Sequence, residues 1–281
     1  MGKKIIALDA GHGMGTAGKR CLQSIDPAQT REWYLNDRIA DRVQELLGAY
    51  DCSVLRVDDT TGTKDISLAN RVKTANTAKA DIYVSVHHNA GINGGSGGGT
   101  VVYYYNDAQM RAKAQRLYDA VVGSTGLIGN RSSKVIANGF YVIMHTTMPA
   151  FLLENGFMDS TKDTPIILTA DHAEKTAQGI VGFLAAELSL RKNDDGQQGG
   201  DESNPSGDQS GSLPDKEETY YPAYTGKKTT LAPALAGIGV NSSYSFRAKI
   251  AAANDIKGYI GTAAQNTRIY NLLVAGLLKR V

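Results

Sequence analysis

The chain has 281 residues, which is enough for one large domain and a small second one. Its two cysteines, Cys21 and Cys52, exclude a disulfide-rich scaffold, and we expect free thiols and synthesis in a reducing compartment. No apolar run approaches the ~20 residues that span a bilayer. The apolar residues 5–8 are interrupted by Asp9, so they are too short for a signal peptide. We therefore expect a protein that does not insert into membranes.

Charge divides the chain into three parts. Residues 1–191 carry 20 basic and 19 acidic residues, residues 192–219 carry 2 and 8, and residues 220–281 carry 8 and 1. Residues 192–219 are also rich in Gly, Ser, Asp, Gln and Pro, which predicts a flexible linker. The basic unit 220–281 should seek an anionic polymer. Because the linker lacks apolar residues that could dock the two units, each is expected to fold independently.

The stretch Asp9-Ala10-Gly11-His12-Gly13 follows an apolar run that reads as a buried strand. Glycines on both sides of His12 allow a tight turn beside a ligand, and ligands of open α/β sheets bind at the carboxyl ends of strands. By itself, His12 is better explained as a buried histidine that caps a turn, so a ligand role depends on other residues of the chain.

A helix is predicted over residues 31–49, because Leu35, Ile39 and Val43 recur at helical spacing. Glu32 falls at the N-terminal end of this apolar stripe. It either meets a partner in the protein interior or complements the helix dipole.

The remaining pattern alternates strands with helices. We predict strands at 53–57, 81–89, 100–106, 140–144 and 150–153, and helices at 66–79, 108–122 and 171–190. This order predicts an α/β fold, a mostly parallel twisted sheet flanked by helices. The glycine-rich residues 91–99 lack the Gly-Lys-Ser/Thr of a phosphate loop and are expected to form a mobile rim.

Two of these strands end in residues that carry chemistry. The strand at 81–89 ends in His87 and His88, which point to opposite faces, so only one of them can meet His12. The strand at 150–153 runs into Glu154. His172 follows Asp171, which forms an apparent capping pair with Glu174, so His172 is expected to be exposed and not to be a ligand.

The C-terminal unit reads as a small helical domain, with helices at 230–238, 243–253 and 262–275, the last opened by the capping pair Thr262 and Gln265. Aromatic residues are the expected source of carbohydrate specificity, namely Tyr221, Tyr224, Tyr244 and Tyr259.

Two histidines and a carboxylate from separate elements, with a second carboxylate nearby, form the donor set of a catalytic zinc site. The segments that carry these residues, together with Arg71 and the stretch 149–157, resemble in order the zinc-dependent type-3 N-acetylmuramoyl-L-alanine amidases over about residues 3–190. The resemblance implies Zn²⁺ held by His12, Glu32 and His87, with Glu154 as the catalytic residue.

Two histidines are not explained by the resemblance. His88 stands where the family usually has a small residue, and we expect it to face away from the metal. His145 is either a substrate contact or an ordinary loop residue.

The resemblance also implies the reaction. The amide between N-acetylmuramic acid and L-alanine of the peptidoglycan stem peptide would be cleaved by a zinc-bound water, with Glu154 as general base and then general acid. Residues 220–281 are similar to the wall-binding modules of endolysins from phages of Gram-positive bacteria. The expected partners are therefore peptidoglycan and a Gram-positive cell-wall polymer, not nucleic acid. The expected site of synthesis is the host cytoplasm, without a signal peptide, and the protein would act on the wall after its release.

Two other functions fit the same residues. A zinc peptidase or deacetylase acting on peptidoglycan would use the same donor set on another bond. A basic unit of short helices also describes nucleic-acid-binding modules.

Overall fold

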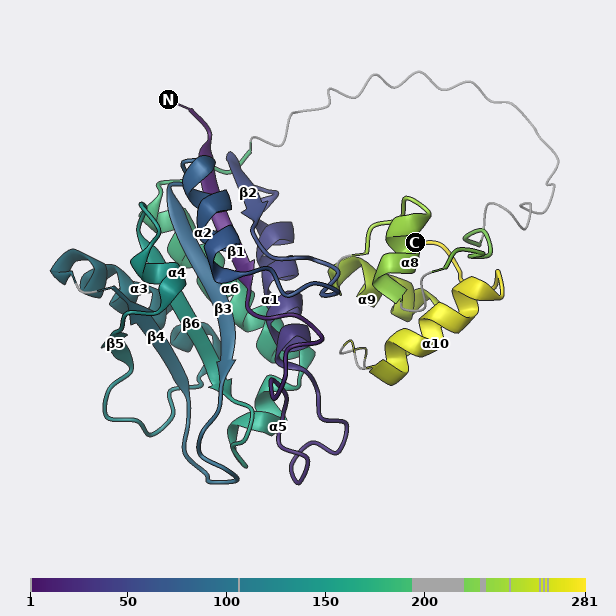
Figure 1. Ribbon diagram of the computed structural model, residues 1–281, viewed down its shortest axis with the longest axis horizontal. Helices are drawn as coiled ribbons and strands as arrows, with labels where there is room; N and C mark the ends of the chain where they lie inside the picture. The colour runs from purple at the N-terminus through teal and green to yellow at the C-terminus, as the bar shows by residue number, and fades with distance from the viewer. Residues whose placement is uncertain are drawn as a thin grey trace, which may run out of the picture.

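The computed structural model describes residues 2–105, 107–193, 220–227, 231–242, 244–257, 259, 261 and 263–281. Its centre is a six-stranded sheet in the order β2-β1-β3-β6-β4-β5. The strands are β1 (Lys4–Ala10), β2 (Cys52–Arg56), β3 (Ile82–Asn89), β4 (Thr100–Tyr104), β5 (Val135–Ala137) and β6 (Ala150–Phe157). All neighbours pair in parallel except β4 and β6, which are antiparallel. The predicted mostly parallel α/β sheet is thus confirmed (Figure 1).

Helices cover both faces of this sheet. One face packs against α1 (Glu32–Leu47), α3 (Ala108–Thr125) and α6 (Ala170–Glu187), and the other against α2 (Leu68–Thr77) and α4 (Tyr141–Met144). Side chains alternate along β3, so Val86 lies in the core beneath α1 whereas Tyr83 lies in the opposite core. The same alternation places His87 and His88 on different faces.

The first helix forms where its apolar stripe can be buried. Ile39, Ala40 and Val43 are completely buried against the sheet, and burying each large aliphatic side chain contributes about 1.5–3 kcal/mol. Glu32 is the first helical residue, and its side chain is only 1% exposed. This burial sets the N-terminal end of α1 against the carboxyl ends of β1 and β3.

Two predicted elements differ from the structure. Residues 140–144, expected as a strand, include the single-turn helix α4, because Val142 and Ile143 pack on the face of the sheet instead of joining its edge. The edge position beside β4 belongs to β5, which the sequence pattern did not indicate. Packing on the sheet face has overridden the β-propensity of this segment.

The start of α6 corrects the prediction for His172. The helix is capped by Thr169, whose hydroxyl accepts a hydrogen bond from the backbone N–H of His172 at 3.1 Å. The helix therefore begins at Ala170, and the side chain of His172 is turned inward and is 2% exposed. The prediction that His172 is exposed was therefore wrong.

The C-terminal helices α8 (Leu231–Gly237), α9 (Tyr244–Ala253) and α10 (Ala263–Val274) form a domain with its own apolar core. Tyr221, Tyr224 and Tyr259 are each buried in that core, which contradicts their expected role as sugar-binding faces. The side chain of Tyr244, the cap residue Thr262 and residues 194–219 of the predicted linker lie outside the described residues.

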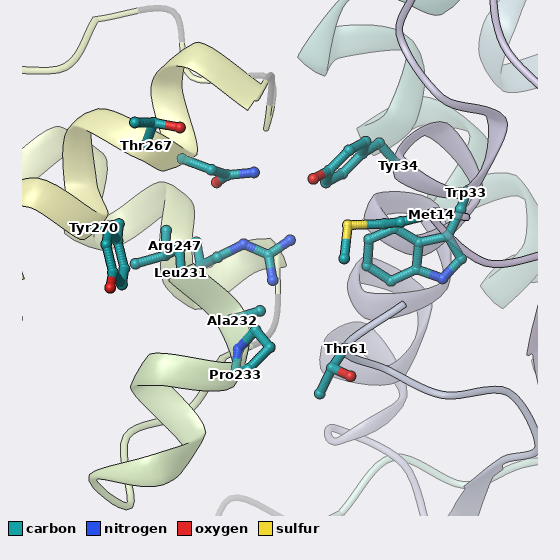
Figure 2. Close-up of a pocket in the computed structure, with 11 residues that line it drawn as sticks. Met14, Trp33, Tyr34, Thr61, Leu231, Ala232, Pro233, Arg247, Thr267 and Tyr270 are labelled. Carbon is teal, nitrogen blue, oxygen red and sulfur yellow. The ribbon is translucent and has the colours of Figure 1, made fainter. Parts of the chain in front are cut away.

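The two domains are in contact. Helix α9 lies beside α1, where Lys249 Nζ is 3.3 Å from Glu45 Oε1 and Arg247 is 3.6 Å from Asp37. A small cavity of about 100 Å³ lies between the domains, with Trp33 and Tyr34 on one side and Arg247 on the other (Figure 2). The domains are thus joined by a surface as well as by the chain between them.

Two expectations about the whole chain can be compared with the structure. Cys21 and Cys52 are both free, as predicted, and both are buried. Among the described residues, we find no helix with the length and apolar character needed to cross a membrane.

Candidate active site

The register of the sheet brings two predicted site residues together. His87 in β3 is paired directly with Glu154 in β6. Partners in a parallel pair project to the same face, so both side chains point to the face that α2 and α4 cover. On the other side of β3, Ala10 is paired with Val86, which places Gly11 beside His87. A methyl group at Gly11 would overlap with the imidazole of His87, so this position requires a residue without a side chain.

His12 reaches the same place by a sharp turn after β1. Its φ of 68° lies in the left-handed region, which is uncommon for a residue with a side chain. Arg71 of α2 stabilises the turn by donating hydrogen bonds to the carbonyl oxygens of Ala10 at 2.9 Å and His12 at 3.0 Å. The position of His12 therefore depends on a second element of the chain.

Arg71 is held in turn by Asp9, with which it forms a buried ion pair. The carboxylate of Asp9 also accepts hydrogen bonds from Tyr83 at 2.9 Å and Ser85 at 2.7 Å. Burial opposes its ionisation, but the positive charge of Arg71 and these bonds outweigh the burial and lower the pKa of Asp9. Asp9 and Arg71 support the site and were not assigned roles from the sequence, although an aspartate in an apolar strand indicates a buried partner.

His12, Glu32 and His87 converge at the carboxyl ends of β1 and β3. Each offers one potential ligand atom, and these atoms lie within 4.8 Å of one another. Glu32 Oε1 is 3.1 Å from Nδ1 of His87 and 3.4 Å from Nε2 of His12. Glu32 thus faces two imidazoles, and its position is not explained by the helix dipole alone.

The electrostatics of this cluster fit a cation. Burial opposes ionisation of Glu32, but the hydrogen bonds to His12 and His87 outweigh it and lower the pKa of Glu32 well below its usual value. Glu32 Oε2 is buried and accepts no hydrogen bond from any residue that the structure describes, and Lys19 Nζ is 3.7 Å away. Two imidazoles and a carboxylate with an unused oxygen are a donor set suited to a divalent metal with open coordination positions.

Glu154 lies beside the cluster, and its pKa is shifted in the opposite direction to that of Glu32. Burial raises its pKa to about 7, although the nearby His87 opposes this shift. Its Oε2 is buried and without a hydrogen-bond partner among the described parts of the chain. A carboxyl group with this pKa can both accept and return a proton near neutral pH.

The other histidines lie elsewhere. His88 is buried on the opposite face of β3, where its Nδ1 is 2.8 Å from Oδ1 of Asn36 and its ring centroid is 6.5 Å from that of His172. Burial lowers the pKa of His172 to about 4. His145 is exposed, with its ring 4.2 Å from the ring of Tyr141. His88, His145 and His172 are therefore not part of the cluster that contains His12.

An open cleft of about 550 Å³ gives access to His12, His87 and Glu154. One wall is apolar and includes Phe140 and Tyr141, and at its rim Leu68 is 53% exposed. Phe140 and Tyr141 were missed as site residues because their segment was interpreted as a strand. A cleft of this size admits a substrate much larger than an amino acid.

Comparison with known proteins places this geometry in a family. The sequence model of the Amidase_3 family, described as N-acetylmuramoyl-L-alanine amidase, matches residues 6–186. The chain is 30% identical over 188 residues to the N-acetylmuramoyl-L-alanine amidase CwlM of Bacillus licheniformis, covering 67% of this chain and 70% of that protein. It is 30% identical over 206 residues to the endolysin of Bacillus phage SPP1, covering 72% of this chain and 73% of the phage protein.

Solved structures agree with the sequence matches. The catalytic domain of CwlV, an N-acetylmuramoyl-L-alanine amidase from Bacillus (Paenibacillus) polymyxa var. colistinus, has a TM-score of 0.60 and 28% identity, covering 67% of this chain and 99% of that chain. The corresponding amidase from Clostridium difficile 630 has a TM-score of 0.60 and 27% identity, covering 67% and 98%. The family match spans more than half of the chain and includes the three residues of the cluster as well as Glu154. The chain accordingly belongs to the N-acetylmuramoyl-L-alanine amidase family of enzymes.

Proposed function

We propose that this enzyme is a zinc-dependent amidase that hydrolyses the bond between the lactyl group of N-acetylmuramic acid and L-alanine of the peptidoglycan stem peptide. The observation that carries the proposal is the pairing of His87, one member of the three-residue cluster, with Glu154 across adjacent strands. A potential metal site and a proton-transfer group thus share one cleft.

His12, Glu32 and His87 would hold the zinc ion, since they supply two imidazoles and one carboxylate and leave positions open. A bound zinc ion supplies Lewis-acid chemistry, by polarising the scissile carbonyl group and acidifying a water molecule. Lys19 and Arg71 line the same cleft but have no lone pair for a metal when protonated, so they are not included in the ligand set.

Glu154 is assigned to proton transfer. Its carboxylate would take a proton from the attacking water, and the resulting carboxylic acid would deliver that proton to the nitrogen of L-alanine as the amide bond breaks. A pKa of about 7 suits both steps, because neither the protonated nor the ionised form is strongly favoured near neutral pH.

The reaction is tested by the products. Purified Gram-positive peptidoglycan is digested with metal-loaded protein and analysed by mass spectrometry, while the metal content is measured on the same sample. Stem peptides with a new L-alanine amino terminus are expected. New termini within the peptide would indicate a peptidase, and loss of acetyl groups a deacetylase, and either result would contradict the amidase assignment.

We further propose an endolysin-type role, in which residues 1–191 form the catalytic domain, residues 192–219 a linker, and residues 220–281 a domain that binds a cell-wall polymer. The endolysin of phage SPP1 among the relatives and the 8 basic residues against 1 acidic residue in 220–281 support this role. The protein would be made in the host cytoplasm and would act on the wall after its release. Binding of the full chain to purified walls, compared with duplex DNA at moderate salt, tests the proposal, and a preference for DNA would contradict it.

A further inference from the structure

We propose that Asn36 is a positioning residue that holds the three potential metal ligands at their mutual distances. The inference rests on the proposed metal site but concerns a residue that contacts no substrate. Asn36 lies in α1 and its side chain is completely buried, with 0% exposure. Its two polar atoms bind two different strands.

The amide of Asn36 bridges the carboxyl ends of β1 and β3. Its Nδ2 donates a hydrogen bond to the carbonyl oxygen of Gly11 at 3.1 Å, and its Oδ1 lies 2.8 Å from Nδ1 of His88. A carbonyl oxygen only accepts, so Nδ2 must face Gly11 and Oδ1 must face His88. His88 therefore donates from Nδ1, and the donor and acceptor of both hydrogen bonds are fixed.

The residues that Asn36 binds are neighbours of the two histidine ligands. Gly11 directly precedes His12, and His88 directly follows His87. The third ligand, Glu32, lies four residues before Asn36 on the same helix, and residues at this spacing share one helical face. One side chain is thus connected, within one residue or one helical turn, to each of the three ligands.

A second contact closes the same arrangement. The backbone N–H of His88 donates to Glu32 Oε1 at 3.2 Å, the oxygen that also faces His12 and His87. If Asn36 were replaced, β1 and β3 would still be paired through the bond from Gly11 N to Val86 O at 3.0 Å. The strands would remain in place, whereas the orientation of α1, and with it the position of Glu32 relative to the two histidines, would lose one of its constraints.

A purely structural role makes a different prediction. A buried amide with two hydrogen bonds stabilises any fold, and its loss lowers stability without changing the affinity for a metal. A positioning role predicts a change in affinity, because outer contacts that orient metal ligands typically contribute about 10- to 100-fold to metal binding. The two roles are therefore separated by measuring zinc affinity and thermal stability on the same variants.

The experiment uses the full chain with Asn36→Leu, which preserves approximate size but cannot form hydrogen bonds. The matched control is Asn254→Leu in the C-terminal domain, where a buried asparagine also binds backbone groups, donating to Ile250 O at 2.8 Å and accepting from Lys279 N at 2.9 Å. Metal-stripped proteins are titrated with zinc against a chromophoric chelator, and their melting temperatures are measured without metal. Should Asn36→Leu not fold, Asn36→Ser, whose side chain is too short to span both partners, takes its place.

We expect zinc binding about 10- to 100-fold weaker for the Asn36 variant and unchanged within about twofold for the control, even though both lose stability. Wild-type affinity in a folded Asn36 variant would overturn the inference, as would an equal loss of affinity in the control. A wild-type protein that binds no zinc would refute both this inference and the proposed metal. Normal zinc binding without release of stem peptides would refute only the proposed reaction.

Discussion

The guanidinium of Arg247 in α9 lies 3.6 Å from Oδ2 of Asp37 in α1, although the two residues belong to different domains and are only 2% and 1% exposed. On the catalytic side, Asp37, Asp41 and Asp58 all contact the single guanidinium of Arg56. Burial, followed by the charge of Asp41, raises the pKa of Asp37 to about 7. Arg247 brings a second positive charge to this acidic group, and its direction toward the catalytic domain is visible in Figure 2.

Arg247→Met should separate the two domains in solution. The variant keeps an apolar stem but removes one of the two cations beside Asp37. The remaining cation, Arg56, is shared with two other aspartates, and a buried carboxylate that loses part of its counter-charge is destabilised. We expect a larger radius of gyration by small-angle X-ray scattering at pH 8, with helix content by circular dichroism unchanged. Arg268→Met, which removes an exposed cation from α10, serves as the control and should scatter like the wild type. An unchanged radius for Arg247→Met would show that the ion pair does not hold the domains together.

Gly11→Ala should weaken metal binding without a backbone conflict. The φ of Gly11 is not positive, so alanine is allowed by the backbone, but its methyl group would overlap with the His87 ring. The His87 ring would have to move away from Gly11 and so leave its present position, in which Nδ1 is 3.1 Å from Glu32 Oε1. Zinc occupancy after dialysis should therefore fall at least about tenfold, by analogy with other changes that misorient a ligand.

Gly15→Ala is the matched control, because a methyl group there meets no atom within 4 Å. Equal zinc occupancy in the two variants would mean that the His87 ring can shift without leaving the site.

Glu154→Gln should retain zinc and lose catalysis. The amide has almost the same shape as the carboxyl group but cannot accept a proton from water, and general acid–base groups contribute about 10²- to 10⁴-fold to rate. We expect a loss of this size in the release of stem peptides, with the metal content of the wild type. His145→Ala provides a comparison outside the cluster and should also keep its metal. Loss of zinc from Glu154→Gln would reassign Glu154 as a ligand.

His172 should make the protein less stable in acid. Burial, with the nearby charge of Arg38, lowers its pKa from 6.5 to about 4 in the folded state. Between these values the unfolded chain binds the proton more readily than the folded chain, so the stability present above pH 6.5 is lost as the pH falls toward 4. The free energy of unfolding should decrease by up to about 3 kcal/mol over this range.

Urea unfolding of the wild type and of His172→Gln at pH 7 and pH 4.5 measures this contribution. The variant should show a smaller decrease in the free energy of unfolding between the two pH values. Equal decreases would place the acid sensitivity in other groups.

The sequence determined the alternation of strands and helices and the placement of His12 and Glu154 near the ends of apolar strands. These features are local, because a buried strand or an amphipathic helix shows its period within ten to twenty residues. The family resemblance added the choice of His87. Local patterns also indicated the C-terminal helices, whose apolar residues repeat at helical spacing.

Tertiary structure decided those contacts between residues distant in the sequence that neither the local pattern nor the family resemblance indicated. The family resemblance grouped Glu32 with two histidines, and the packing of α1 on the sheet brings these side chains together. Only that packing shows that Asn36 binds the ends of two strands. Packing also turned residues 141–144 into a helix and buried His172, against the local pattern. The contact between Arg247 and Asp37 could not be predicted either, because the local sequence around a charged helical residue does not indicate which distant surface it will pack against.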